Sequence, residues 1–144
     1  MYSPYIKQNQ ETHAVELVRK VKILIVDDEE LICWSLKHSF EKVRGYHVNC
    51  AHTGSDALQE LNENRYDLVI TDLNLPDVND FNIVTKIKKI ASDTPVIVIS
   101  ASLCGPFLDD VIKQGAYKCF NKPFEIETVL GEVEKAVRYN IAVQ

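Results

Sequence analysis

The sequence predicts an α/β protein built on a doubly wound, five-stranded parallel sheet. Short apolar segments recur along the chain, stretches with helical spacing of apolar residues separate them, and several segments end in a polar side chain. Continuous apolar runs are typical of parallel strands covered by helices on both faces. Strict alternation of such strands with helices predicts βαβ units with right-handed crossovers.

The expected strands are segments rich in Val, Ile and Leu, bounded by turn residues or helices. They span residues 21–27, 46–51, 67–72, 95–100 and 117–120. Pro95 opens the fourth strand, and the short fifth strand leads to Lys122-Pro123. Four of the five strands therefore end in, or just before, a side chain with a charged group or a hydroxyl. The second strand is the exception.

The expected helices show apolar residues at spacings of three and four. They span residues 29–43, 53–64, 81–90, 106–115 and 125–139. Gly45 ends the first helix, and Thr53 starts the second as an N-cap residue. Pro106 in the first turn and Gly115 at the end of the fourth helix fit the usual asymmetry of helix termini.

Length and composition indicate one globular domain. The chain has 144 residues, of which 46% are hydrophobic and 26% charged, and its net charge is −5. These values predict no direct nucleic-acid contact. With neither a membrane-length apolar run nor a signal-peptide core, we expect a cytoplasmic protein without a membrane partner. Because the four cysteines form no CxxC pair, we expect reduced, buried thiols.

The first 20 residues carry little periodic pattern and predict an extension. We expect residues 1–20 to be partly disordered and to end in a helical turn capped by Thr12. Residues 21–140 form the expected domain, with no output domain after it.

Charged or hydroxyl side chains stand at the carboxyl ends of four of the predicted strands. Asp27 and Asp28 follow the first strand, Asp72 the third, Ser100 ends the fourth, and Lys122 follows the fifth. The carboxyl ends of neighbouring parallel strands meet at one crevice, so we expect these side chains to lie together. Lys122 and Ser100 suit phosphoryl oxygens. The sequence thus predicts a site for a divalent cation and a phosphoryl group.

A carboxylate that accepts a phosphoryl group needs a cation to screen the approaching anion. Mg²⁺ prefers oxygen ligands and retains several waters. We expect Asp28 and Asp72 to bind it directly, Asp27 through water, and Asn74 through its backbone carbonyl. Two carboxylates about 4 Å apart repel by roughly 4 kcal/mol at an effective dielectric constant of 20. A cluster of three therefore favours a bound cation.

Each residue also has a purely structural interpretation. The run Asp27-Asp28-Glu29-Glu30 before an apolar helix is also a good N-cap and first-turn charge set. Asp72 alone can begin a turn, and Lys122 alone can lie in an exposed loop. Their joint occurrence at successive strand ends favours the functional interpretation.

These motifs resemble those of the two-component response-regulator receiver domain, in its stand-alone, CheY-like form. The matching motifs are Ile25-Val26-Asp27-Asp28-Glu29, Asp72-Leu73-Asn74-Leu75-Pro76, Ser100-Ala101 and Lys122-Pro123-Phe124. They stand in family order between about Lys22 and Tyr139. The resemblance implies a flavodoxin-like fold with strand order 2-1-3-4-5 and a cis Lys122–Pro123 bond.

The resemblance also implies the function. Asp72 would be the phosphoacceptor, taking the group from a sensor histidine kinase or a histidine phosphotransfer protein in a reaction that needs Mg²⁺, or Mn²⁺ in its place. Ser100 would be the switch hydroxyl, with Ala101 beside it, and Lys122 would bind the phosphate. Asn74 and Ser102 hold the positions that tune autodephosphorylation. Such a protein catalyses only its own phosphorylation and dephosphorylation.

Output in this family uses the surface of the fourth helix, fifth strand and fifth helix. We expect a monomer or weak dimer that signals through this surface to a separate partner, or that relays the phosphoryl group. The first helix contacts the kinase in this family. Its Trp34 is either part of that contact or partly buried core.

Two positions depart from the family pattern. Three residues before Lys122, where the family has an aromatic switch residue, this sequence has Cys119. Strand alternation places Phe120 on the opposite face from Cys119, in the core. Asp80 stands where the family usually has Gly.

Two other functions compete with this interpretation. An Asp-nucleophile phosphatase of the haloacid dehalogenase type needs a DxDx[TV] pattern and a cap, whereas Asp27-Asp28 are adjacent and the chain is short. A receiver-like interaction module that works without phosphate would keep the fold. The intact carboxylates and Lys122 argue against it.

Overall fold

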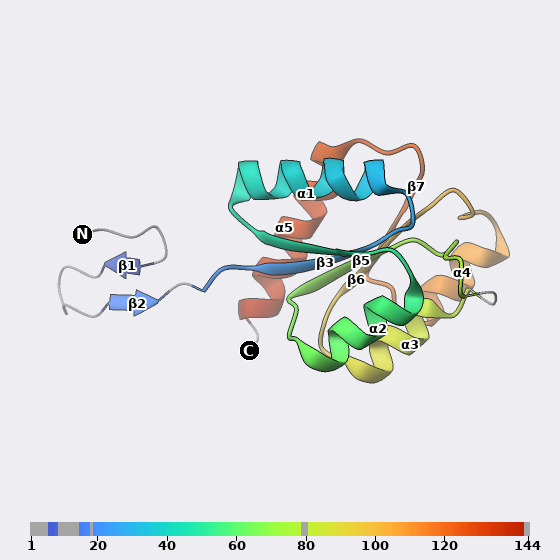
Figure 1. The fold of residues 1–144 in the computed structure, drawn as a ribbon, viewed down its shortest axis with the longest axis horizontal. Coiled ribbons are helices and arrows are strands. Elements are labelled where there is room, and N and C mark those ends of the chain that lie inside the picture. Colours follow the sequence, from blue (N-terminus) through green and yellow to red (C-terminus); the bar gives the residue numbers. More distant parts are fainter. Residues whose placement is uncertain (1–5, 9–14, 18, 79–80, 143–144) are drawn as a thin grey trace.

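Five apolar segments of the chain pair side by side in one parallel sheet (Figure 1). The computed structural model describes residues 6–8, 15–17, 19–78 and 81–142. The strands of this sheet are β3 (Lys22–Val26), β4 (His47–Ala51), β5 (Leu68–Thr71), β6 (Val96–Ser100) and β7 (Lys118–Asn121). Their order is β4-β3-β5-β6-β7, which confirms the predicted 2-1-3-4-5 arrangement.

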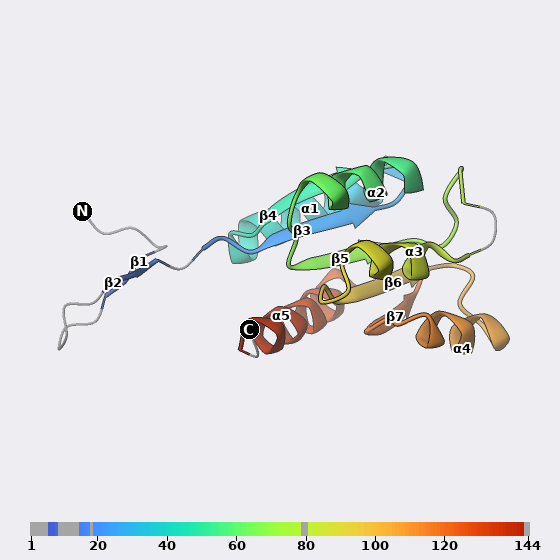
Figure 2. The ribbon, with the colours of Figure 1, turned by 90° about the horizontal axis from the view of Figure 1, so that it is seen from below.

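Helices alternate with these strands, as predicted. They are α1 (Glu30–Arg44), α2 (Gly54–Glu63), α3 (Ile83–Ile90), α4 (Pro106–Lys113) and α5 (Ile126–Ala142). Figures 1 and 2 show α1 and α5 on one face of the sheet and α2, α3 and α4 on the other. No helix in the described ranges is both long and apolar enough to cross a bilayer.

The two faces of the sheet bury two separate apolar clusters. In β3, Ile23 and Ile25 pack with α1 and α5, whereas Leu24 and Val26 pack with α2 and α3. All four side chains are at most 1% exposed. Because both faces are covered, the strand reads as a continuous apolar run rather than an alternating one.

The register of the strands places the polar residues that follow them. The backbone N–H of Asp27 donates to the carbonyl of Ala51 at 3.0 Å, and that of Asp72 to Val26 at 2.9 Å. The N–H of Lys122 donates to Ser100 at 3.1 Å. The ladders thus continue one residue past the apolar segments, and they fix these residues at one edge of the sheet.

The loop after Asp72 is held against the start of α2. The Asp77 carboxylate accepts hydrogen bonds from the N–H groups of Gly54 (2.7 Å) and Ser55 (2.8 Å). These bonds lower the pKa of Asp77 below its usual value. A Cβ at Gly54 would lie 2.5 Å from Cγ2 of Val78, so this position needs glycine for the loop to approach the helix. Thr53 caps α2, as predicted, by accepting from Asp56 N–H at 3.0 Å.

One prediction for the N-terminal extension is wrong. Val15 to Leu17 form a strand, β2 (Val15–Leu17), which pairs antiparallel with β1 (Ile6–Gln8). The apolar-charged-apolar order of Val15-Glu16-Leu17 has a period of two, which suits a strand better than a helical turn. The proposed cap, Thr12, lies outside the described residues, as does Asp80.

The segment leading into β3 is anchored by a buried carboxylate. Asp67, 5% exposed, accepts two hydrogen bonds from the Arg19 guanidinium and one from the N–H of Lys22 at 2.8 Å. Burial alone would raise the pKa of Asp67, but the bonds from Arg19 and Lys22 outweigh burial, and the pKa is lowered. The charged form is therefore stabilised by folding.

Replacing Asp67 by Asn tests this anchor. We expect Asp67→Asn to lower the free energy of unfolding by about 1–3 kcal/mol at pH 7, because it removes a charge-assisted pair and leaves amide hydrogens facing donors. The pKa of Asp67 is lowered from 3.8, so its contribution is complete above about pH 4 and disappears as pH falls through the folded-state pKa. Urea unfolding at pH 7 and below pH 4 measures both effects.

Asp93→Asn, at an exposed carboxylate, is the matched control and should change stability by less than about 0.5 kcal/mol. An equal loss for both variants, or a loss at Asp67 that does not shrink in acid, would contradict this account.

Candidate functional site

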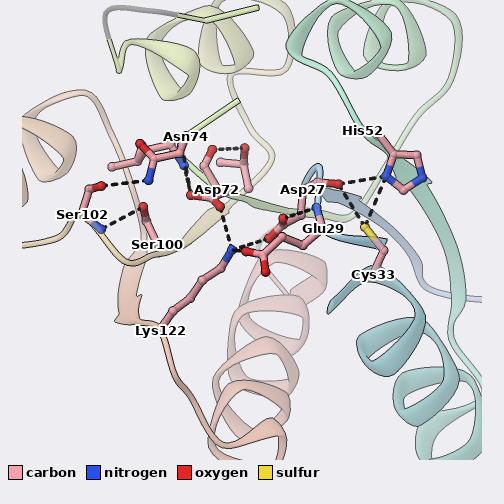
Figure 3. Close-up of polar contacts among 11 residues, drawn as sticks. Asp27, Glu29, Cys33, His52, Asp72, Asn74, Ser100, Ser102 and Lys122 are labelled. Atoms are coloured by element: carbon pink, nitrogen blue, oxygen red, sulfur yellow. Dashed lines mark hydrogen bonds and ion pairs between the residues drawn. The ribbon is translucent and has the colours of Figure 1, made fainter. Parts of the chain in front are cut away.

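Three carboxylates and one ammonium group converge at the carboxyl edge of the sheet (Figure 3). The ammonium of Lys122, which follows β7, lies 2.7 Å from Asp72, 2.9 Å from Asp27 and 2.7 Å from Glu29. The side chains of Asp27 and Asp72 are each 4% exposed and that of Lys122 12%. A single cation thus compensates two buried carboxylates and one exposed one.

The neighbouring carboxylates stabilise the charged form of Lys122. Burial alone would lower its pKa, but hydrogen bonds to Asp72, Glu29 and Asp27 outweigh burial and raise the pKa above its usual value. Burial raises the pKa of Asp27, and the bonds from Glu29 N–H and Lys122 only partly oppose that. Burial therefore disfavours the charged form of Asp27, and the Lys122 ammonium partly offsets this effect.

The Asp72 carboxylate is fixed in orientation by its own loop. Its Oδ1 accepts hydrogen bonds from the N–H of Leu73 (2.6 Å) and of Asn74 (3.0 Å). Its Oδ2 accepts from Lys122 at 2.7 Å. One oxygen is therefore tied to the backbone, and the other faces the cation.

Asp27 is fixed through both its carboxylate and its backbone. Oδ1 accepts from the N–H of Glu29 at 2.9 Å. The carbonyl oxygen of Asp27 lies 3.3 Å from the Cys33 thiol and 2.9 Å from Nδ1 of His52. A carbonyl only accepts, so both groups donate to it. These two contacts join residues 6 and 25 positions apart, so no local sequence pattern indicates them.

Glu29, for which no role is predicted from the sequence, joins the two buried aspartates. The carboxylate oxygens of Asp27, Glu29 and Asp72 lie within 4.8 Å of one another, whereas Asp28 is exposed and outside this group. Glu29 is the N-cap residue of α1, but its side chain makes no capping bond. It turns to Lys122 instead. The only sequence signal for Glu29 was its place directly after the two aspartates.

A second set of polar residues lies beside Asp72. Ser100 is fully buried, and its hydroxyl accepts from the N–H of Ser102 at 3.2 Å. The Ser102 hydroxyl in turn accepts from the side-chain amide of Asn74 at 2.8 Å. Figure 3 shows this chain of contacts on the side of Asp72 away from Asp27. It links the loop after β5 to the loop after β6.

A cavity opens next to this cluster. It has a volume of about 480 Å³ and is lined by Glu29, Ile32, Ala101, Lys122, Pro123 and Phe124. The Lys122–Pro123 bond is cis, as predicted. Ala101 is exposed, so the loop after β6 borders the entrance.

The structure separates Cys119 from Phe120, as strand alternation predicts. Cys119 packs against the cluster under α2, α3 and α4, and Phe120 against the one under α1 and α5. Burial raises the pKa of the Cys119 thiol. The prediction that the cysteines are buried holds for Cys33 alone, because Cys50 and Cys119 are half-buried and Cys104 is exposed.

Two surfaces near the site expose apolar side chains. On α1, Trp34 is 62% exposed and stacks on His38 with ring centroids 5.1 Å apart, which decides against a core role. Around α4 and β7, Phe107 is 46%, Ile112 54% and Tyr117 44% exposed.

The donor set fits a hard divalent cation. Carboxylate and carbonyl oxygens at one edge are the ligands that Mg²⁺ uses, and nitrogen and sulfur ligands are not part of the cluster among the described residues. The Asp28 carboxylate has no hydrogen bond or ion pair to any described residue, so it can join the set without losing a partner.

Comparison with known proteins identifies the family. The model of the response regulator receiver domain matches residues 23–134. This chain belongs to that family. The match contains every site residue discussed above.

The similar proteins agree with this assignment. The uncharacterized transcriptional regulatory protein YkoG of Bacillus subtilis is 36% identical over 123 residues, covering 85% of this chain and 54% of its own length. The transcriptional regulatory protein KdpE of Mycobacterium tuberculosis is 35% identical over 120 residues, covering 83% of this chain and 52% of its own. The chain thus spans about half the length of these relatives.

A CheY-like receiver domain from Methanospirillum hungatei has the same fold. It superposes with a TM-score of 0.83 at 23% identity, over 88% of this chain and all of the other. The chain is therefore a receiver domain of two-component systems in sequence and in architecture.

Replacing Lys122 tests the charge balance of the site. We expect Lys122→Gln to lower the free energy of unfolding by about 3–5 kcal/mol without added metal, because it leaves buried carboxylates uncompensated. Millimolar Mg²⁺ should restore part of this loss. Urea unfolding with EDTA and with Mg²⁺ measures both. The matched control is Lys113→Gln, at an exposed lysine of α4, for which neither effect is expected.

Proposed function

We propose that this receiver domain accepts a phosphoryl group on Asp72, in a Mg²⁺-dependent reaction, from a sensor histidine kinase or a histidine phosphotransfer protein. The observation that carries the proposal is the Asp72 carboxylate, buried and held with one oxygen against the Lys122 ammonium at 2.7 Å. Membership of the family supports it.

The orientation of Asp72 suits nucleophilic attack on phosphorus. Oδ1 is held by two backbone N–H groups, so Oδ2 is the oxygen left to form the new bond. As the Asp72 oxygen bonds to phosphorus, the bond between phosphorus and the donor's histidine nitrogen breaks, and the imidazole takes up a proton. Lys122 is placed to neutralise charge on the transferred oxygens.

We assign the cation to Asp27, Asp28, Asp72 and the backbone carbonyl of Asn74. When bound, Mg²⁺ would neutralise charge on the phosphoryl oxygens. Of these residues, Asp27 and Asp72 already lie together, and Asp28 is adjacent in sequence with a carboxylate free of other contacts among the described residues. Mn²⁺ has the same preference for oxygen ligands and would serve in its place.

Ser100 and Ser102 would respond to the phosphoryl group. The buried Ser100 hydroxyl, with the N–H of Ala101 beside it, would bond a phosphoryl oxygen. A new bond from Ser100 to the phosphoryl group would disturb the hydrogen bond that Ser100 accepts from the Ser102 N–H. The neighbouring contact between Ser102 and Asn74, now 2.8 Å long, would change as a result. Both are small and neutral, so they leave room for the water that hydrolyses the aspartyl phosphate. The chain would catalyse only these two reactions of its own.

The donor would approach across α1 and the cavity lined by Glu29, Lys122 and Pro123. Leu31 is 74% and Trp34 62% exposed on α1, and they offer apolar area beside that entrance. Exposed apolar side chains of this kind contribute strongly to protein contacts.

Output would pass through α4, β7 and α5. Without an aromatic residue at position 119, we assign the link to the loop that follows Asp72. Gln114 at the end of α4 donates to the carbonyl of Phe81 at 3.0 Å and accepts from the N–H of Thr85 at 3.1 Å. The rings of Phe81 and Phe107 lie edge to face at 5.4 Å. A shift of this loop would therefore move α4 and bias its exposed surface toward a separate partner, or the phosphoryl group would be relayed onward.

The first test is phosphorylation by a small donor. With acetyl phosphate and Mg²⁺, we expect the intact mass to rise by one phosphoryl group, and EDTA to prevent the gain. Asp72→Asn should show no gain, whereas Asp109→Asn, at an exposed carboxylate of α4, should behave as the parent. A gain that persists in Asp72→Asn would refute the assignment. Lack of any gain, including with a histidine kinase as donor, would leave the phosphate-independent interaction module.

The second test separates the roles of neighbouring carboxylates. We expect Asp28→Asn to weaken Mg²⁺ binding at least about ten-fold, because it removes a charge close to a dication. Glu29→Gln should weaken it less, because we place Glu29 outside the ligand set. Isothermal titration calorimetry on the unphosphorylated protein gives both dissociation constants. The reverse order would place Glu29, not Asp28, among the ligands.

A further inference from the structure

A pair of thiols lies directly behind the acidic cluster and has no part in the proposed phosphoryl transfer. Cys33 is on α1 and 3% exposed, and Cys50 is on β4, the edge strand, and half-buried. The Cys50 sulfur lies 3.9 Å from the carbonyl oxygen of Cys33, and each thiol shifts the pKa of the other. The Cys50 sulfur is thus packed against the residue to which it would bond.

We propose that Cys33 and Cys50 are a redox-active pair that forms an intramolecular disulfide with a peroxide-class oxidant and thereby weakens cation binding at the acidic cluster. The pair joins α1 to β4, and it touches the backbone of Asp27 through Cys33. The disulfide itself does not depend on the proposed function. Its effect on the cation does.

Cys50 is the thiol that reacts first. Cys50 is half-buried on a strand at the edge of the sheet, whereas Cys33 is only 3% exposed, so Cys50 is the more accessible of the two to an oxidant. Its interaction with Cys33 lowers the pKa of the Cys50 thiol below its usual value, with Lys37 and His52 adding to the effect, although burial opposes it. A lowered pKa increases the thiolate fraction of Cys50, and the thiolate is the nucleophilic form.

The reaction balances with one peroxide. The Cys50 thiolate attacks one oxygen of hydrogen peroxide, the O–O bond breaks, and the departing hydroxide takes a proton to become water. The Cys33 sulfur then attacks the sulfur of the Cys50 sulfenic acid, and the hydroxyl leaves as a second water with the Cys33 proton. Two thiols lose two electrons in total. A dithiol reductant reverses the change by exchange.

The consequence for the acidic cluster follows from the Asp27 carbonyl. It accepts from the Cys33 thiol at 3.3 Å and from His52 at 2.9 Å. A disulfide has no S–H, so oxidation removes one donor and draws the Cys33 sulfur toward Cys50. The carboxylate of the same residue lies 2.9 Å from Lys122 in the cluster. Partners that hold a ligating group typically contribute ten-fold or more to metal affinity, and we expect the shift of the Asp27 backbone to act on its carboxylate in the same direction.

The first part of the test is chemical. Folded, reduced protein is treated with hydrogen peroxide, remaining thiols are alkylated, and peptides are mapped by mass spectrometry. We expect a peptide pair linked through Cys33 and Cys50 that disappears with dithiothreitol. Cys104→Ser, at the exposed thiol, should give the same link, and neither Cys50→Ser nor Cys50→Ala should give it. Absence of this link in the parent would overturn the proposal.

The second part measures Mg²⁺ binding by calorimetry in the reduced and oxidised states. We expect the dissociation constant to rise about ten-fold on oxidation of the parent and of Cys104→Ser, and to stay unchanged in peroxide-treated Cys50→Ser. Equal affinities in both states of the parent would overturn the coupling to the cluster. Absence of Mg²⁺ binding in the reduced parent would instead refute the proposed function, with the peptide map still deciding on the disulfide.

Discussion

The contact of the Lys122 ammonium with three carboxylates is the interaction on which the site depends. Asp27 and Asp72 are buried, and their mutual repulsion at this range would reach several kcal/mol without a cation. Lys122 offsets that repulsion, and a cis peptide bond follows it directly. The ammonium therefore allows two buried carboxylates to lie side by side at this edge of the sheet.

The sheet register makes this contact a property of the whole fold. Asp27, Asp72 and Lys122 are each positioned by a backbone hydrogen bond that extends a parallel strand ladder by one residue. Two apolar clusters, one under α1 and α5 and one under α2, α3 and α4, hold the strands in that register. A shift of one residue would turn buried apolar side chains away from their cluster, so core packing and site geometry are fixed together.

The acidic cluster makes different contacts toward α4 and toward α1. Toward α4, the loop after Asp72 reaches the helix through Gln114 and the edge-to-face rings of Phe81 and Phe107. Toward α1, the Asp27 backbone meets the Cys33 thiol and His52. One acidic centre thus has physical connections to a candidate output surface and to a candidate redox pair, through contacts that share no residue.

The sequence alone determined the strand and helix order, because apolar runs and helical spacing are local patterns that burial on two faces imposes. It also determined that Asp27, Asp72, Ser100 and Lys122 meet, because parallel strands share one carboxyl edge. Only the tertiary structure decided that Glu29 contacts Lys122, and that Cys33 and His52 support Asp27. The same holds for the exposure of Trp34. Side-chain direction and pairing between distant segments depend on packing, which no local pattern encodes.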